Sequence, residues 1–315
     1  MSEFQIVLRA VLPVFGIALA GLCIRKLNWL TEEADQSLLR VNINVLLPCL
    51  ILDSALGNPA LSHLNNLLLP PLVGFATLAV GLGLGIAASR LHGLPDRAQK
   101  RTFAVSVGMY NYGYIPVPLS ILLFDKETTG VLFVHNVGVE TGLWTLCVML
   151  LTGGNLWRDW KKVLNPPLLA ILAAILLNGV GLEKNVPEVL RTAIHWLGQC
   201  AIPMALILIG AIVADYLNQF HSAHGWRVIG TAVLLRIVVL PFLFVLLAKF
   251  LPCSVELKRV IVLEAAMPSA VFPIIMARHY GGDPPTALRV VIGTSLVGLV
   301  TIPLWIRFGL KFAGL

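Results

Sequence analysis

Two stretches decide the fold of this chain: GMYNYGYIPVPLS at residues 108–120 and LEAAMPSAVFPII at residues 263–275. Both interrupt apolar runs with prolines and polar residues, and a shift of 158 residues aligns Asn111 with Ser269. Inside a bilayer, a broken helix survives only where its freed backbone groups contact protein, water or a ligand. Two such breaks at corresponding positions in the two halves are typical of secondary transporters.

The composition indicates an integral membrane protein. The chain has 315 residues, of which 57% are hydrophobic and 12% are charged, and its mean hydropathy is +0.86. Because a helix needs about 20 apolar residues to cross the hydrocarbon core, the charged and Gly/Pro/Asn positions divide the sequence into ten spans. They lie at about 5–24, 36–56, 67–89, 101–124, 130–152, 163–181, 190–214, 226–250, 257–279 and 286–310.

The distribution of Lys and Arg predicts that both termini lie outside the cytoplasm. With this orientation the inner loops carry about twice as many of these residues as the outer loops. The net charge of +7 then reflects membrane topology and not a nucleic-acid surface. The start MSEFQIV has no basic residue before its apolar run, which predicts a retained first span. The five cysteines have no CxxC spacing, so zinc and disulfide frameworks are not expected.

Ten spans divide into two halves of five, residues 1–152 and residues 153–315, with a basic loop between them. Because each half has an odd number of spans, the second half enters the membrane inverted. LPCLILDSALG at 47–57 also resembles IPMALILIGA at 202–211, each with a proline before an aliphatic run. The predicted fold class is an all-α integral membrane protein of ten transmembrane helices, arranged as two inverted five-helix repeats with crossing broken helices in spans 4 and 9.

The two breaks supply candidates for substrate binding. The half-helix after a break points its amide groups at the gap, which suits an anion, whereas the half-helix before it ends in free carbonyls, which suit a cation. Asn111 has a donor and an acceptor, with which it can cap the second half-helix or bind a carboxylate or an ion. The substrate-binding candidates are Asn111, Tyr112, Gly113, Pro116, Pro268, Ser269, Ala270 and Pro273.

Polar residues inside spans supply candidates for a coupling ion, because a charge at the membrane centre costs about 3 kcal/mol. Glu264 lies about one helical turn before Pro268. Its carboxylate and nearby carbonyls could coordinate sodium, or it could carry a proton; the alternative is a structural carboxylate paired with a base such as Arg236. The coupling-ion candidates are Glu264, Met267, Glu140, Asn136, Thr141 and Ser295, with Glu264 as the candidate sodium ligand.

Three secondary candidates are His135, Arg236 and Asp53. His135 shares one side of span 5 with Glu140, where they would form a proton relay, an ion site or an internal hydrogen-bond network. Arg236 lies deep in span 8, where it would hold the second carboxylate of a dicarboxylate or neutralise Glu264. Asp53 lies near the outer end of span 2 and reaches the interface.

Three segments resemble a known family. MPSAVFPIIMARHYGGDPPTALRVVIGTSLVGLVTIPLW at 267–305 closely resembles the end of bacterial auxin efflux carrier family members, a group that includes malonate and malate carriers. NYGYIPVPL at 111–119 resembles that family's pattern in span 4, and LLPCLIL in span 2 also matches. The family is distantly similar to the bile acid:sodium symporters.

The resemblance implies a scaffold of residues 1–66 plus 163–214 and a moving transport core of residues 67–152 plus 226–315. It also implies elevator-type alternating access and a homodimer formed through spans 2 and 7. In the sodium symporters a glutamate before the break in span 9 binds sodium, and Glu264 looks like it.

The predicted function is secondary active transport of small organic anions, coupled to sodium or protons, in the inner membrane of a bacterium. The anions are mono- or dicarboxylates, auxin-like or malonate/malate-like. The alternative is a sensor or a channel built on a transporter fold. The sequence contains no GxxxxGK[ST], HExxH or GxSxG motif, so neither an ATP-driven pump nor an enzyme is expected. The expected partners are the anion, sodium or a proton and the lipid bilayer, with no cofactor and no nucleic acid.

Overall fold

The computed structural model describes residues 3–91, 94, 96–154, 164–216 and 225–315. The basic loop between the two predicted halves lies outside these residues. The described helices are α1 (Glu3–Lys26), α2 (Glu32–Val41), α3 (Leu47–Ala55), α4 (Leu64–Leu91), α5 (Arg97–Gly108), α6 (Pro116–Leu123), α7 (Lys126–Gly142), α8 (Val148–Thr152), α9 (Pro166–Gly179), α10 (Glu188–Tyr216), α11 (Trp226–Val233), α12 (Leu240–Phe250), α13 (Val255–Ala265), α14 (Phe272–Tyr280) and α15 (Pro284–Ala313).

Six helical stretches in the described residues are long and apolar enough to cross a membrane. Three of them join two α-helices through a π-helical turn, at Asn42–Leu46, Leu143–Cys147 and Leu234–Val239. The shorter α9 is also apolar. The prediction of an all-helical, multi-pass membrane protein is therefore confirmed.

The chain leaves the helical conformation at both predicted breaks. α5 ends at Gly108 and α6 begins at Pro116, while α13 ends at Ala265 and α14 begins at Phe272. Prolines follow both interruptions, because a proline cannot donate an amide hydrogen within a helix but is well tolerated in its first turn. Several helices begin before the predicted apolar spans, since capping residues such as Asp125 and Ser254 start them in the loops.

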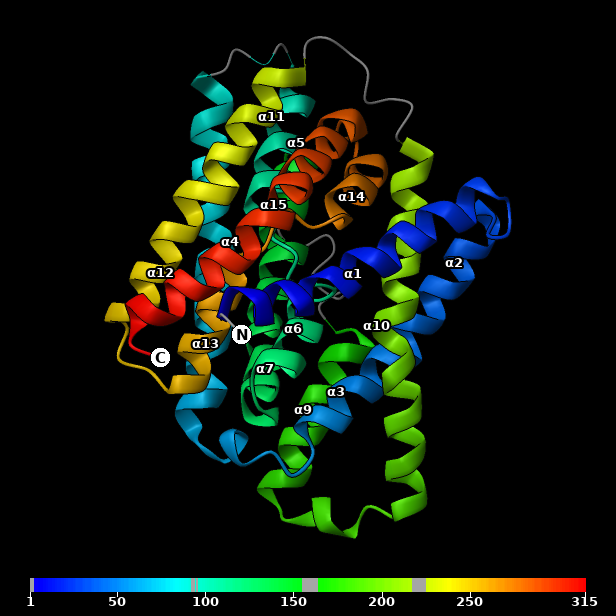
Figure 1. The fold of residues 1–315 in the computed structure, drawn as a ribbon, viewed down its shortest axis with the longest axis vertical. Helices are drawn as coiled ribbons and strands as arrows, with labels where there is room; N and C mark the ends of the chain where they lie inside the picture. Colours follow the sequence, from blue (N-terminus) through cyan, green and yellow to red (C-terminus); the bar gives the residue numbers. More distant parts are fainter. Residues whose placement is uncertain (1–2, 92–93, 95, 155–163, 217–224) are drawn as a thin grey trace.

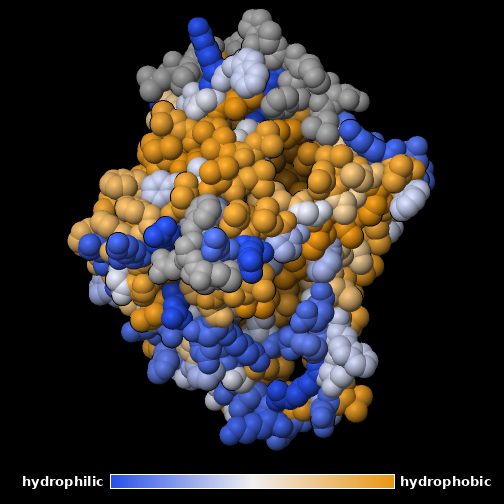
Figure 2. Space-filling model, viewed as in Figure 1, coloured by the Kyte–Doolittle hydropathy of each residue, from blue (hydrophilic) through white to orange (hydrophobic). Residues whose placement is uncertain are grey.

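The helices form two neighbouring groups (Figure 1). In one group α10 packs against α1 and α3, and α3 packs against α9. In the other, α4 packs against α5 and α7, α12 packs against α13, and α11 packs against α15. Figure 2 shows apolar side chains over most of the middle of one face, with hydrophilic side chains toward its lower end and upper margin. This distribution is that of a protein surrounded by lipid.

Glycine allows α4 and α7 to approach closely. A Cβ atom at Gly138 would lie 1.7 Å from the carbonyl oxygen of Pro71, and one at Gly74 would lie 2.3 Å from the carbonyl oxygen of His135. Small residues at helix interfaces are the usual means of close packing in membranes, where the hydrophobic effect does not drive helices together. These contacts hold α7 beside the first break.

A tryptophan on α15 compensates for a proline in the neighbouring helix. Pro241 has no amide hydrogen, so the carbonyl of Ile237 lacks its regular α-helical partner. The indole Nε1 of Trp305 donates to this carbonyl oxygen at 2.7 Å. The bond joins α15 to the helix that contains the π-helical turn.

Replacing this tryptophan by phenylalanine should destabilise the fold. Trp305→Phe keeps an aromatic ring but leaves the Ile237 carbonyl without the indole donor, at an expected cost of about 1 kcal/mol in the free energy of unfolding. Thermal melting of the purified protein in detergent measures the effect. Phe308→Leu, one turn further along α15, serves as the control for loss of aromatic surface alone, and an equal loss in both variants would contradict the assignment.

Two loops link the halves of the chain by similar contacts. Asp125 caps α7 and accepts a hydrogen bond at 2.6 Å from Arg259 near the start of α13. Asp283 caps α15, and its amide donates at 2.9 Å to the Thr102 hydroxyl near the start of α5. Each broken helix thus begins beside the loop that starts a long helix of the other half.

The Asp125 contact should make stability depend on pH. Partial burial raises the pKa of the Asp125 carboxyl group, but hydrogen bonds from Thr128 and Arg259 outweigh it and hold the pKa below the ordinary value of 3.8. A carboxyl group whose pKa is lowered by folding stabilises the fold above its unfolded-state pKa, and this contribution is lost as the pH falls through the folded-state pKa.

We therefore expect Asp125→Asn to lower the free energy of unfolding at neutral pH by less than about 1 kcal/mol, because the pair is partly exposed. The difference from the unmodified protein should shrink as the pH falls below about 4. Melting temperatures across this range measure it, with Glu127→Gln as a neighbouring control. A difference that stays constant with pH would show that the charge does not contribute.

Candidate functional site

The two broken segments pair with each other through an isolated antiparallel β-bridge. The amide of Asn111 donates to the carbonyl oxygen of Pro268 at 2.8 Å, and the amide of Ala270 donates to that of Met109 at 2.9 Å. Tyr110 and Ser269 form the resulting antiparallel bridge. Each break therefore satisfies part of the freed backbone of the other, which lets two interrupted helices exist at one place inside the membrane.

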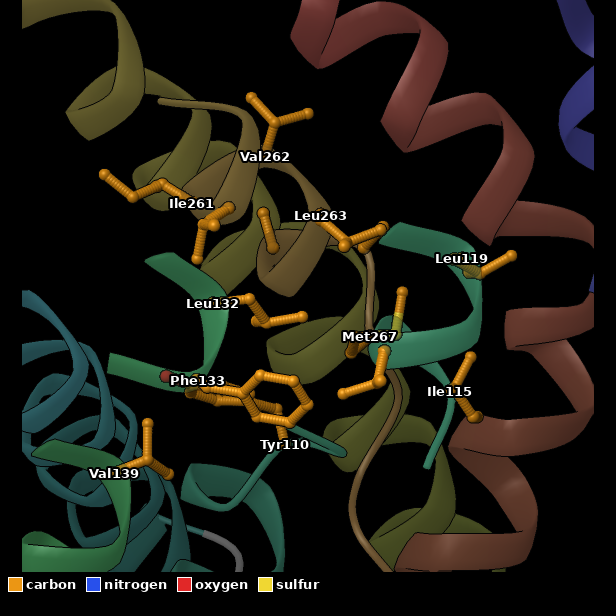
Figure 3. Close-up of a cluster of buried hydrophobic side chains, with 14 of the residues drawn as sticks. Tyr110, Ile115, Leu119, Leu132, Phe133, Val139, Ile261, Val262, Leu263 and Met267 are labelled. Atoms are coloured by element: carbon orange, nitrogen blue, oxygen red, sulfur yellow. The ribbon is translucent and has the colours of Figure 1, made fainter. Parts of the chain in front are cut away.

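Apolar packing holds this crossing in place. Figure 3 shows Tyr110 and Met267, one from each break, within a cluster that includes Leu132 and Phe133 of α7 and Leu263 of α13. The Tyr110 ring is fully buried, and its hydroxyl group lies 2.9 Å from the hydroxyl group of Thr77 on α4. Side chains of α4, α7 and α13 thus pack around the crossing.

A polar residue of each break, Asn111 or Ser269, lies shortly before the half-helix that follows it. The Asn111 side-chain oxygen accepts from the Ile115 amide at 3.3 Å, just before Pro116 opens α6. The Ser269 amide donates to the Thr294 hydroxyl of α15 at 3.2 Å, whereas the Ser269 hydroxyl has no partner among the described residues. Amide groups at the start of a helix attract negative charge.

A cavity of about 330 Å³ opens at these residues. Its polar groups come from Asn111, Ser269 and Ser295, and its walls are apolar side chains of α1, α10 and α15. None of the described residues that line it is Lys, Arg, His, Asp or Glu. Apolar walls with a few convergent polar groups are the usual character of a small-molecule site.

A smaller cavity of about 60 Å³ touches the first break from α3, α7 and α9. Tyr112 and Gly113 line it together with Asn136 and Glu140. The Asn136 side chain donates to the Tyr112 carbonyl oxygen at 2.7 Å, and the Asn165 side chain, at the start of α9, donates to Glu140. The polar groups of this cavity are therefore largely paired.

A broad polar groove of about 1110 Å³ adjoins the larger cavity. It is lined by α2, α10, α14 and the start of α15, and its charged residues include Glu32, Asp35, Arg40 and Arg278. Figure 2 shows a hollow between the segments that Figure 1 labels α14 and α10. Because consecutive residues of α10 line the groove and the cavity, the two spaces are neighbours.

Arg236 occupies the carbonyl end of α13. It lies in the π-helical turn Leu234–Val239 and is 0% exposed. Its Nε donates to the Met267 carbonyl oxygen at 2.9 Å and its Nη2 donates to the Glu264 carbonyl oxygen at 3.2 Å. The guanidinium carbon also lies 4.9 Å from the centroid of the Tyr110 ring. Arg236 thus binds carbonyl groups at the end of the half-helix where the sequence analysis expected a cation. It lines neither of the two cavities.

The Glu264 side chain accepts no hydrogen bond from this guanidinium group. The side chain is 2% exposed, and neither carboxyl oxygen has a hydrogen-bond partner among the described residues. The alternative that the Glu264 carboxylate pairs with Arg236 is therefore not seen as a hydrogen bond. Arg236 donates to backbone carbonyls of the same turn instead.

The residues assigned to a coupling ion lie in separate places. Glu140 and Asn136 line the smaller cavity, and Ser295 lines the larger one. The Thr141 hydroxyl donates to the Val137 carbonyl of its own helix at 2.7 Å. Among the described residues, no group of three or more His, Cys, Asp or Glu could hold a metal ion. A sodium ion at Glu264 would also meet carbonyl groups that already bind Arg236, so this donor set does not fit sodium.

The secondary candidates His135 and Asp53 lie in different environments, and the third, Arg236, lies at the carbonyl end of α13. His135 is buried beside Tyr110, with a ring centroid distance of 6.5 Å, and one of its ring nitrogens lies 3.4 Å from the side-chain oxygen of Asn136. Asp53 pairs with His195 at 3.0 Å and thereby joins α3 to α10. Pro273, in the first turn of α14, is buried and serves to start that half-helix.

Sequence reasoning missed the walls of the larger cavity. Phe15 and Ala18 of α1 and Leu206 and Ile209 of α10 form much of it. Nothing in their apolar pattern distinguishes them from lipid-facing residues. The π-helical turn that positions Arg236 was also missed, although Pro241 shortly after it was a signal of irregular geometry.

Comparison with known proteins relates the chain to a transporter family. The sequence model of the family described as membrane transport protein matches residues 6–158 and 155–306. An uncharacterized transporter of Methanothermobacter thermautotrophicus is 28% identical over 303 residues, which cover 94% of this chain and 96% of that protein. An uncharacterized transporter of Methanocaldococcus jannaschii is 22% identical over 302 residues, with the same coverage. Auxin efflux carrier component 8 of Arabidopsis thaliana is 27% identical over 179 residues, 56% of this chain and 45% of that protein.

Proposed function

Because this chain belongs to the membrane transport protein family, that of the auxin efflux carriers, we propose that it is a secondary active transporter of small organic anions. The observation that carries the proposal is the larger cavity beside the crossing, where Asn111 and Ser269 stand at the starts of two half-helices. The positive ends of both helix dipoles favour a carboxylate there. The apolar walls of the cavity would contact the rest of the transported anion.

The pocket chemistry favours monocarboxylates with an apolar body over dicarboxylates. A second carboxylate would need a cationic partner or water, and no described residue lining the larger cavity is cationic. Arg236, considered from the sequence for this role, is buried against the carbonyl end of α13. Auxin-like acids therefore suit this cavity better than malonate or malate.

The proposed architecture is ten spans in two inverted repeats, residues 1–152 and 153–315. Its support is that the larger cavity lies among α1, α10 and α15, which the repeat relates to α9, α3 and α7 around the smaller one. Two corresponding cavities of unequal volume are what one state of an alternating-access carrier should have. In Figure 1 the α9–α10 connection also lies beyond the lower ends of α4 and α13, in keeping with an elevator displacement of the core against the scaffold.

We place the protein in the bacterial inner membrane with both termini outside the cytoplasm, as a homodimer through spans 2 and 7. With this orientation the polar groove and larger cavity open toward the cytoplasm. Sodium or a proton is the proposed coupling ion, and a proton is the ion that Glu264, the buried carboxyl group at the crossing, would carry.

Thermal melting of the purified protein tests the proposal directly. A ligand that binds only the folded state raises the melting temperature. The panel contains mono- and dicarboxylates, each with sodium or choline at two pH values, followed by uptake of the stabilising acids into vesicles. Stabilisation and uptake of one acid support a carrier. Stabilisation without uptake would indicate a sensor, and currents without coupling would indicate a channel.

Asn111→Ala should weaken anion binding at least about tenfold, because it removes a polar group from the cavity and the acceptor of the Ile115 amide just before α6. The measurement is the concentration of acid that half-saturates the thermal shift. Asn65→Ala, at an exposed asparagine of α4 that lines neither cavity nor the polar groove, is the control. Equal affinity of the Asn111 variant and the unmodified protein would remove Asn111 from the site.

Ser295→Phe should abolish uptake by filling the larger cavity with an aromatic ring. Its melting temperature without acid should remain within a few degrees of the unmodified value, because the ring enters open space. Val300→Phe places the same ring on an exposed position of α15 and should transport normally. Unchanged uptake by the Ser295 variant would show that the cavity is not on the substrate path.

A further inference from the structure

The guanidinium group of Arg236 places a positive charge at the carbonyl end of α13. The last carbonyl groups of a helix have no partners within it and hold partial negative charge. In α13 two carbonyls of the final turn and the break, those of Glu264 and Met267, receive hydrogen bonds from Arg236. A dissociable cation at this end would use the same oxygens.

The surroundings of the guanidinium group are those of a cation site. The Tyr110 and Phe244 rings lie 4.9 Å and 5.7 Å from its central carbon, and aromatic faces attract positive charge. Glu264 extends from the same turn with both carboxyl oxygens unpartnered among the described residues. Carbonyl oxygens, ring faces and a carboxyl group thus surround one covalently attached positive charge.

A sodium ion cannot share this position with Arg236. The two carbonyl oxygens already accept hydrogen bonds, and a second positive charge within a few ångströms of a fully buried guanidinium would be strongly repelled in a medium of low polarity. The π-helical turn at Leu234–Val239 helps to place Arg236 at this end, and such turns occur frequently at functional sites.

We propose that the Arg236 guanidinium group takes the place of a sodium ion at the C-terminal end of α13, so that transport uses no sodium ion at this position. The inference rests on the proposed function, because it concerns how the carrier is driven. Arg236 is on this account a positioning residue that fixes charge at the crossing and does not contact the transported anion.

The test is melting of the purified full chain in about 0.1 M sodium chloride or choline chloride, with no acid present. The unmodified protein should melt at the same temperature in both salts. Arg236→Met frees the two carbonyl oxygens beside the unpartnered carboxyl group of Glu264, and should gain a sodium-dependent rise of about 3 °C. Arg236→Lys keeps a positive charge and should show no sodium response.

The double variant Arg236→Met/Glu264→Gln locates any gained response and should lose it. Arg236→Gln, which keeps an amide donor but no charge, replaces the Met variant if that variant does not fold, with the same expected gain. A folded neutral variant without a sodium response would overturn the proposal, since a purely structural arginine would behave in this way. A sodium response of the unmodified protein that disappears in Glu264→Gln would also overturn the proposal. If no neutral variant folds, this comparison of the unmodified protein with Glu264→Gln is the deciding test.

These outcomes are separate from those of the proposed function. Failure to find any bound or transported acid would remove the anion carrier but leave the cation result standing, because melting without acid measures only the cation. A sodium response of the unmodified protein that Glu264→Gln abolishes would remove the present inference and leave anion transport intact.

Discussion

The structure depends on two backbone hydrogen bonds between segments far apart in the sequence. The Asn111 amide binds the Pro268 carbonyl, and the Ala270 amide binds the Met109 carbonyl. Without them, two helices would each expose an unpaired stretch of backbone inside the hydrocarbon core, where every unsatisfied group costs several kcal/mol. The two halves of the chain must therefore fold together at this point, and the contacts of Asp125 with Arg259 and of Asp283 with Thr102 fix their relative position at either end.

The helix ends at the crossing have different surroundings. The carbonyl end of α13 is closed by a buried arginine, while the starts of α6 and α14 face a cavity of about 330 Å³. This asymmetry follows from charge. A fixed guanidinium neutralises the negative end within the protein, whereas the positive ends keep their attraction for an anion from solution. Under the proposed function, the backbone would supply the selectivity for anions and the apolar walls would select among them.

The candidate site could be predicted only in part. Asn111 and Ser269 were found because proline and polar residues inside an apolar run mark a break in a membrane helix, and both border the cavity. The ion candidates were chosen from the expectation that polar side chains in spans converge, yet Glu140 is paired with Asn165 and Thr141 binds its own helix. Helical position says which side of a helix a residue occupies, but not which neighbour faces that side.

The sequence by itself determined that the chain is helical, that it crosses a membrane several times, and that two of its helices break, because hydrophobic length and proline are local properties of the chain. Only the tertiary structure decided that the breaks pair with each other, that Arg236 closes the carbonyl end of α13, and that α1 and α10 wall the cavity. These features depend on contacts between residues separated by tens to hundreds of positions. Such contacts are fixed by how helices pack in three dimensions, which no local pattern encodes.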